Sequence, residues 1–218
     1  IVPTDWVKSS MIKKWEINPN QVRVKSNKLF KYNIPIINNL KNDNKYHIIY
    51  PANSLPHKNH LVILKALNKL KDLNKNIYDS IVLHLTISIE DSKQINDFVL
   101  KYNLSNMIVF EGQIKFSKIL EFYKNYDLLL FPSYIESFGY PLAEAAMFGM
   151  PIIASDFPYA RDVIYGYDGV KFIKYNDPLL WANSIIISFK LKKKYKCYSK
   201  NYKNQWSSIN LLVDSILK

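Results

Sequence analysis

Residues 128–156 read LLLFPSYIESFGYPLAEAAMFGMPIIASD, and they hold the clearest succession of structural signals in the chain. It begins and ends with short apolar runs typical of buried strands, and the segment between them is typical of a loop followed by a short helix. Pro141 suits the first turn of that helix because its missing N–H would have no partner there, and Gly149 suits the position just beyond the end. The stretch therefore predicts strand, loop, helix and strand, with the helix over about Pro141 to Phe148.

The same alternation continues through most of the chain. Helical segments place apolar residues three or four positions apart, as at Ile63, Ala66 and Leu67 and more briefly at Phe122 and Tyr123, and such stripes indicate core-facing sides. Repeated strand and helix units predict an α/β fold, a Rossmann-like parallel sheet of about six strands with helices on both faces. The predicted strands are Tyr46–Tyr50, Ile81–Thr86, Met107–Phe110, Asp127–Phe131, Pro151–Ser155 and Val170–Ile173.

The composition is that of a folded protein. Of the 218 residues, 48% are hydrophobic and 14% aromatic, which is too many for a disordered chain. No apolar run reaches the roughly 18 residues of a membrane-spanning helix, and residues 1–10 lack the pattern of a secretion signal. The single cysteine, Cys197, cannot form an internal disulfide, so we expect a cytoplasmic protein.

The net charge of +12 is the feature that would suggest a nucleic acid or an anionic membrane as partner. Only Arg23 and Arg161 are arginines, so lysine supplies nearly all of the positive charge. Lysine lacks the forked geometry that reads bases and grips phosphates. We therefore predict a solvated lysine-rich surface and no nucleic-acid partner, with a polyanion-binding or membrane-surface protein as an alternative.

The loop within residues 128–156 has the features of an anion-binding site. In a parallel sheet such a loop opens onto the binding crevice, and the helix N-terminus that follows offers free N–H groups and a positive dipole end. Gly139 allows the main chain to approach a ligand closely. Glu136 in the loop and Glu144 one turn into the helix can accept hydrogen bonds from sugar hydroxyls. Glycosidases also use two acids, but a helix N-terminus between them favours a phosphate-bearing ligand.

This segment resembles the E-x7-E motif of the family-4 glycosyltransferases, enzymes of the GT-B fold. Its surroundings recur in the same order in that family, and the similarity covers about residues 46–190. They are Phe110-Glu-Gly112, a helix ending at Tyr126-Asp127, Leu128-Leu-Leu-Phe-Pro-Ser133 and Gly149-Met-Pro-Ile-Ile-Ala-Ser-Asp156. The resemblance implies the C-terminal, nucleotide-sugar-binding half of such an enzyme.

The resemblance also implies roles for individual residues. Glu144 would hold the ribose hydroxyls of the nucleotide, and Glu136 would hold the transferred sugar. The backbone at Phe138, Gly139 and Tyr140 would meet the sugar and the diphosphate. All five residues are therefore expected to bind the donor.

A second donor-binding segment is implied after the first strand, where the family usually presents an arginine and, five residues later, a lysine to the diphosphate. Lys58 matches the lysine, whereas Asn53 occupies the arginine position, so one expected positive charge is absent there. His57 and His60 are three residues apart, but no nearby acid or cysteine completes a metal-binding set. We therefore expect no metal site.

For the chemistry, the resemblance implies transfer of a sugar from a nucleoside-diphosphate sugar to a carbohydrate or lipid-linked acceptor, with retained configuration and no cofactor. Glu136 and Lys58 are the expected catalytic residues, because Lys58 and the helix N-terminus would stabilise the charge that develops on the leaving diphosphate. We expect a role in bacterial-type surface polysaccharide or glycoconjugate synthesis, in the cytoplasm or at the inner face of the membrane. A nucleotide-sugar-binding module without transferase activity is a further alternative.

The two ends of the chain depart from the alternating pattern. Residues 1–45, with a predicted helix over Asp5–Trp15 and a predicted strand over Asn18–Lys25, resemble the remnant of an N-terminal acceptor domain and its linker. Residues 46–190 are the predicted donor-binding domain. Residues 191–218 are a predicted helical tail that either packs on the fold or contacts a membrane surface. Since the acceptor domain is largely missing, we expect donor binding without a full rate of transfer.

Overall fold

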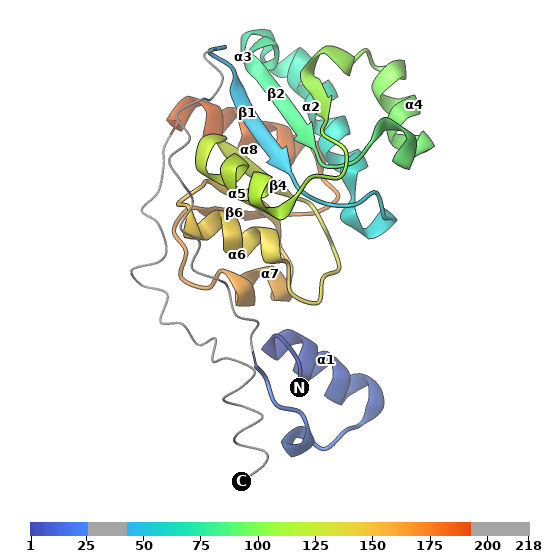
Figure 1. Ribbon diagram of the computed structural model, residues 1–218, viewed down its shortest axis with the longest axis vertical. Helices are drawn as coiled ribbons and strands as arrows, with labels where there is room; N and C mark the ends of the chain where they lie inside the picture. Colours follow the sequence, from blue (N-terminus) through green and yellow to red (C-terminus); the bar gives the residue numbers. More distant parts are fainter. Residues whose placement is uncertain (26–42, 193–218) are drawn as a thin grey trace.

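The computed structural model describes residues 1–25 and 43–192, and its centre is a six-stranded sheet (Figure 1). All neighbouring strands are parallel, in the order β3-β2-β1-β4-β5-β6. The strands are β1 Tyr46–Tyr50, β2 Ile81–Leu85, β3 Ile108–Phe110, β4 Leu128–Phe131, β5 Ile152–Ser155 and β6 Val170–Ile173. Their bounds agree with the prediction within one residue, and the predicted parallel α/β sheet is confirmed.

Burial explains why the central strands are almost entirely apolar. Every residue of β1, β4 and β5 is buried, as expected for strands that have helices on both faces. The edge strand β6 is more exposed, with only Ile173 buried. The register of β1 starts with Tyr46 opposite Ile81 on β2 and with Ile48 opposite Leu128 on β4.

The strand order places a topological switch point between β1 and β4. The chain runs outward from β1 to β2 and β3, then returns to β4 on the other side of β1 and continues to β5 and β6. In open parallel sheets, ligands bind outside the carboxyl ends of the strands at such a point. The loops that leave Tyr50 and Phe131 therefore define where a site should be sought.

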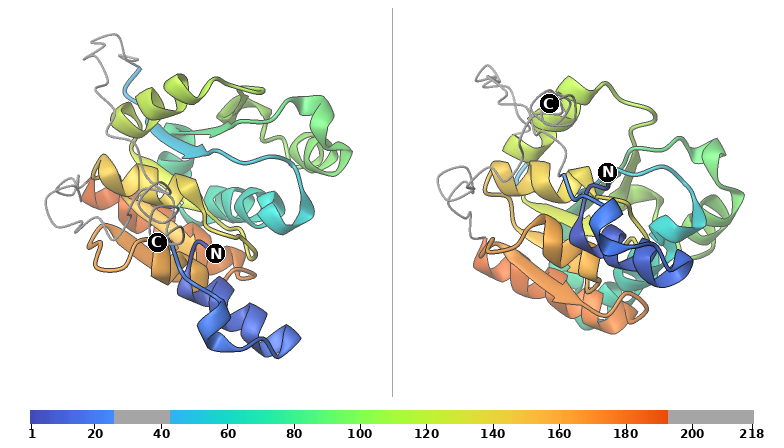
Figure 2. Two further views of the ribbon diagram at one scale, coloured as in Figure 1. Left: turned by 60° about the horizontal axis from the view of Figure 1, so that its bottom comes forward. Right: turned by 90° about the horizontal axis from the view of Figure 1, so that it is seen from below.

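Helices cover both faces of the sheet (Figures 1 and 2). On one face α2 packs against α3, α4 and α8, and on the other face α6 packs against α5 and α7. Their bounds are α2 His60–Leu73, α3 Lys75–Ser80, α4 Lys93–Lys101, α5 Phe116–Asn125, α6 Tyr140–Met147, α7 Pro158–Val163 and α8 Pro178–Leu191. Short 3-10 helices are η1 Pro19–Gln21, η2 Pro56–Lys58, η3 Ile89–Asp91 and η4 Ser105–Met107.

The helix α6 begins and ends close to the residues predicted from Pro141 and Gly149. It starts one residue before Pro141 and ends one residue before Phe148, so the predicted bounds are shifted by one position. Gly139 is its N-cap with a φ of 88°, and Gly149 beyond its end has a φ of 68°. Both glycines thus adopt left-handed backbone, which residues with a Cβ rarely do.

The N-terminal segment forms a small unit beside α7. The predicted helix is confirmed as α1 (Asp5–Trp15), and the backbone N–H of Trp6 donates to Asp162 Oδ2 at 2.9 Å (Figure 1). The predicted strand over 18–25 is wrong, because Pro19 starts the 3-10 helix η1 and only Val24 makes a parallel bridge, to Val2. Proline lacks the N–H of a ladder residue and suits the start of a helical turn.

The rest of the end regions lies outside the described residues. This applies to residues 26–42 of the predicted linker and to residues 193–218 of the predicted tail. Among the helices of residues 1–25 and 43–192, none combines the length and the hydropathy that a membrane span requires.

Candidate functional site

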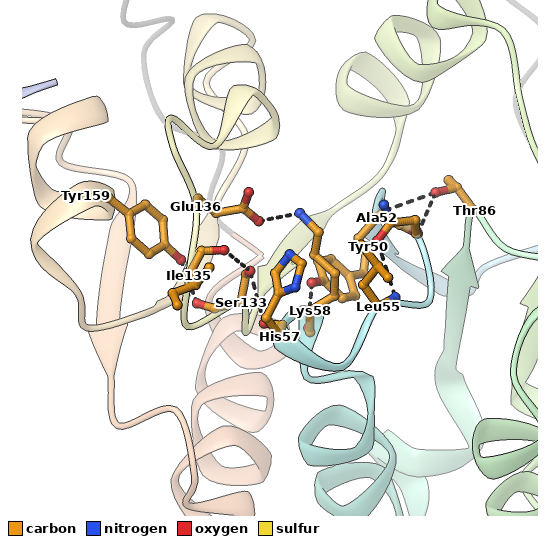
Figure 3. Close-up of polar contacts among 11 residues, drawn as sticks. Tyr50, Ala52, Leu55, His57, Lys58, Thr86, Ser133, Ile135, Glu136 and Tyr159 are labelled. Atoms are coloured by element: carbon orange, nitrogen blue, oxygen red, sulfur yellow. Dashed lines mark hydrogen bonds and ion pairs between the residues drawn. The ribbon is translucent and has the colours of Figure 1, made fainter. Parts of the chain in front are cut away.

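An ion pair joins Lys58 and Glu136 where the loops after β1 and β4 meet (Figure 3). Lys58 Nζ lies 2.6 Å from Glu136 Oε1, and the two side chains are 15% and 13% exposed. Because both groups are largely shielded from water, their attraction is screened less than that of a surface pair. The structure thus brings the two predicted catalytic residues together, although 78 positions separate them in the sequence.

The two loops are also joined at the carbonyl of His57, and Figure 3 shows the bond that the hydroxyl of Ser133 makes to it. The carbonyl oxygen of His57 accepts from the N–H of Tyr134 at 3.1 Å and lies 3.2 Å from the hydroxyl oxygen of Ser133. On the other side, the buried Tyr159 hydroxyl of α7 donates to the carbonyl of Ser133 at 2.5 Å. Bonds on both sides hold the start of the Glu136 loop in one position.

Buried rings support the loop that carries Lys58. The Tyr50 hydroxyl, at the end of β1, donates to the carbonyl of Lys58 at 2.6 Å. Burial, with a smaller contribution from Glu136, raises the pKa of Tyr50, so the hydroxyl stays a neutral donor. The His60 ring lies 4.7 Å from that of Tyr50, and burial, helped by the charge of Lys58, lowers the pKa of His60 to about 4. Nε2 of His60 has no hydrogen-bond partner among the described residues.

The start of α6 lies just after Glu136 and combines a buried ring, a glycine and an exposed tyrosine. Phe138 is buried in the core, and Gly139 follows it in left-handed backbone. A Cβ on Gly139 would lie 3.4 Å from Leu142 and 3.6 Å from Phe131, so this turn is packed closely underneath. The side chain of Tyr140 is 44% exposed. Of these predicted donor-binding residues, Phe138 can therefore offer a ligand only its main chain.

Glu144 occupies a different environment from Glu136. It is only 7% exposed, and its Oε2 accepts a 3.0 Å hydrogen bond from the hydroxyl of Tyr123, a fully buried residue of α5. Burial raises the pKa of Glu144 to about 7, although the Tyr123 hydrogen bond acts in the opposite direction. Glu144 thus interacts with α5, whereas Glu136 interacts with Lys58.

Asn53, at the position of the usual arginine, supports its own loop. Its Oδ1 accepts from the N–H of Leu55 at 3.3 Å, and the residue is exposed. The same loop is attached to β2 through the N–H of Ala52, which donates to Thr86 Oγ1 at 3.0 Å (Figure 3). Asn53 therefore gives the loop its turn but adds no positive charge.

Sequence reasoning missed the aromatic residues that position the site. The sequence analysis assigns no role in the site to Tyr50, Tyr123 or Tyr159, yet each directs its hydroxyl to a site residue or to its loop. A usable signal exists, because a buried tyrosine needs a hydrogen-bond partner for its hydroxyl. The sequence does not say which partner it takes.

The sequence predicts no metal site. In the part of the chain that the structure describes, no group of three or more histidine, cysteine or acidic residues could hold a metal ion. The metal independence of the chemistry remains a prediction.

Comparisons with known proteins agree with this architecture. A family model described as glycosyl transferases group 1 matches residues 36–205. The O-antigen chain mannosyltransferase RfbU of Salmonella typhimurium is 24% identical over 181 residues, which is 82% of this chain and 47% of RfbU. The chain thus spans about half the length of the curated relative it matches.

Solved structures show the same fold at low sequence identity. A glycosyltransferase from Rickettsia africae superposes with a TM-score of 0.78 at 19% identity, over 98% of this chain and 60% of that chain. HepE from Anabaena, solved with UDP and glucose, superposes with a TM-score of 0.79 at 15% identity, over 99% of this chain and 62% of that chain. The chain therefore belongs to the group 1 glycosyl transferases, and its sheet matches the C-terminal domain of their GT-B fold.

Proposed function

We propose that this chain supplies the donor site of a retaining, metal-independent glycosyltransferase that uses a nucleoside-diphosphate sugar. The observation that carries the proposal is the shielded pair of Lys58 and Glu136 beside the start of α6, at the switch point of the sheet. A cation and a helix N-terminus together suit a diphosphate. A carboxylate beside them suits sugar hydroxyls.

Binding of a diphosphate would change the partners of Lys58. Its ammonium group is paired with the carboxylate of Glu136. A diphosphate that approaches the N-terminus of α6 would compete for this ammonium group, and Glu136 would then be available to accept hydroxyls of the sugar. The pair therefore holds both groups ready without leaving either charge unpaired in a partly buried place.

Stabilisation of the leaving group is the catalytic task of these residues. In the transfer, the bond between the anomeric carbon and the diphosphate oxygen breaks and a bond to the acceptor oxygen forms. Negative charge develops on the diphosphate, and preorganised donors that face it lower the barrier. Lys58 and the N–H groups at the start of α6 are those donors in our proposal, since Asn53 brings no charge.

Glu144 has the properties of a ribose-binding acid. Its carboxylate is fixed by Tyr123 and is largely shielded from water. Charged hydrogen bonds in such surroundings are stronger than neutral ones. Hydroxyls of the ribose would offset the burial that now raises its pKa.

The relatives indicate the kind of substrate. HepE was solved with UDP and glucose, and RfbU is an O-antigen chain mannosyltransferase. We therefore propose a hexose as the transferred sugar and a carbohydrate or lipid-linked acceptor, in the synthesis of a surface polysaccharide or glycoconjugate. A donor-binding module without transfer is the second candidate, because Lys58, Glu136 and Glu144 all face the donor in our proposal.

Thermal unfolding with a panel of nucleotide sugars tests the proposal. Full-length protein should be stabilised by at least one nucleoside-diphosphate sugar, since a ligand that binds the folded state raises its stability. Lys58→Gln should abolish most of the shift, whereas Lys65→Gln, an exposed lysine of α2, should not. Stabilisation by heparin or anionic vesicles alone would contradict the proposal. Sugar transfer to an added acceptor then separates an enzyme from a binding module.

A further inference from the structure

Asn59 connects three loops around the candidate donor site. It lies between Lys58 and His60, and its Nδ2 donates to the carbonyl of Pro132 at 3.2 Å and to the carbonyl of Tyr175 at 2.9 Å. Those carbonyls belong to the loops after β4 and β6. One amide group thus joins the Lys58 loop to two loops that are remote in sequence.

The backbone at Asn59 explains why few residues suit this position. Its φ is 57° and its ψ is 37°, in the left-handed region that glycine adopts most easily and asparagine tolerates better than most residues. Glycine would supply the backbone without the two N–H donors. Asparagine supplies both.

The side chain of Asn59 is also diverted from its ordinary role. Asn59 is the N-cap of α2, where an asparagine side chain usually accepts from an N–H of the first helical turn. Here α2 has no side-chain cap, and the amide donates across the site instead. The side-chain orientation that makes these two hydrogen bonds thus leaves the first turn of α2 without a side-chain cap.

We propose that Asn59 is a positioning residue of the donor site, which fixes the loops after β4 and β6 against the loop of Lys58. The proposal rests on the donor-binding function inferred above. Lys58 precedes Asn59, and Glu136 lies four residues after Pro132. The amide therefore holds together the backbones of the two segments whose ammonium group and carboxylate are to receive the diphosphate and the sugar.

The test uses two variants of Asn59 and one matched control in the full-length protein. Asn59→Gly keeps the left-handed backbone but removes both hydrogen bonds, and Asn59→Asp places acceptors against two carbonyl oxygens. The control is Asn103→Gly, because Asn103 is an exposed asparagine with a φ of 53° in the turn after α4. Asn103→Gly also replaces an asparagine in left-handed backbone by glycine, but in a turn away from the candidate site.

Affinity for UDP and for GDP, measured by calorimetry, is the first readout. Asn59→Gly loses two hydrogen bonds that order the site. Its affinity for whichever of UDP and GDP binds wild-type protein more tightly should therefore fall by about 5- to 30-fold. The affinity of Asn59→Asp should fall by at least as much. Asn103→Gly should bind within about twofold of wild type. A purely local effect on folding would lower the melting temperature without changing the affinity of the folded protein.

A double-mutant cycle shows whether Asn59 acts through Lys58. In a Lys58→Gln background, Asn59→Gly should weaken nucleotide binding by less than about threefold, because the positioned charge is already absent. The same loss in both backgrounds would overturn the inference, as would wild-type affinity in Asn59→Gly. If wild-type protein binds neither nucleotide nor any sugar nucleotide, the proposed function fails instead.

Hydrogen exchange of the ligand-free protein gives an independent readout. The N–H of Tyr134 donates to the carbonyl of His57 across the two loops. Asn59→Gly should raise the exchange rate of this N–H at least about fivefold, because the loops separate more often. An unchanged rate would overturn the positioning role whether or not a nucleotide binds.

Discussion

The burial of Glu144, a proposed donor-site residue, predicts that its carboxylate lowers the stability of the protein without a bound nucleotide. Burial raises its pKa from 4.5 to about 7. Between these two values the folded protein keeps a proton on Glu144 that the unfolded chain releases. Stability therefore falls as the pH rises through this interval, and the full penalty applies above pH 7. A pKa rise of this size corresponds to about 3 kcal/mol.

Glu144→Gln removes the titration and keeps the shape. The amide oxygen can still accept from the Tyr123 hydroxyl, and the side chain stays neutral at every pH. We expect the variant to be about 2–3 kcal/mol more stable than wild type near pH 8.5 and nearly equal to it near pH 4.5. Urea unfolding across this pH range, with both proteins in the same buffers, measures the difference.

A control variant and a nucleotide-binding measurement show whether the effect is specific to the buried Glu144. Glu90→Gln changes an exposed glutamate in the same way and should leave the stability unchanged at every pH. Glu144→Gln should also weaken nucleotide binding at pH 8 by roughly 10- to 100-fold, because a charged acceptor is lost. A stability difference between Glu144→Gln and wild type that does not vary with pH would refute the reasoning.

Three further outcomes are expected. Gly139→Ala should destabilise the protein by about 1–2 kcal/mol in urea unfolding and weaken nucleotide binding, because its φ of 88° is strained for alanine. Gly169→Ala should lower stability by about 2 kcal/mol or more without changing the affinity of folded protein, since its Cβ would overlap the ring of buried Tyr167, which donates to the carbonyl of Met150. Chelation by EDTA should leave nucleotide affinity within about twofold, whereas a strict requirement for Mg²⁺ or Mn²⁺ would contradict metal independence.

Local patterns were sufficient to predict the strands and the helix α6. The central strands β1, β4 and β5 are short apolar runs because they are buried on both faces, and Pro141 and Gly149 mark the ends of α6 through backbone geometry. The strand predicted near Val24 was wrong because a single proline, Pro19, favours a helical turn over a ladder. Features that depend on a few neighbouring residues, such as strand positions and helix ends, could thus be predicted from one sequence.

The contacts of the site could not be predicted in the same way. The pairing of Lys58 with Glu136 and the hydrogen bond from Tyr123 to Glu144 join residues on different elements. Their distances depend on how the loops and helices pack, which no local pattern specifies. The resemblance to a family supplied candidate residues, and the structure supplied their partners.

The separate roles of Glu136 and Lys58 are the central claim, and calorimetric titration of UDP and of the preferred UDP or GDP sugar tests it most directly. Lys58→Gln should weaken the nucleotide and the sugar nucleotide by a similar factor of about 10 or more, because both contain the diphosphate. Glu136→Gln should weaken the sugar nucleotide by a similar factor and leave the free nucleotide within about threefold of wild type, since the sugar hydroxyls lose their acceptor. Equal loss of both ligands in Glu136→Gln would contradict the account.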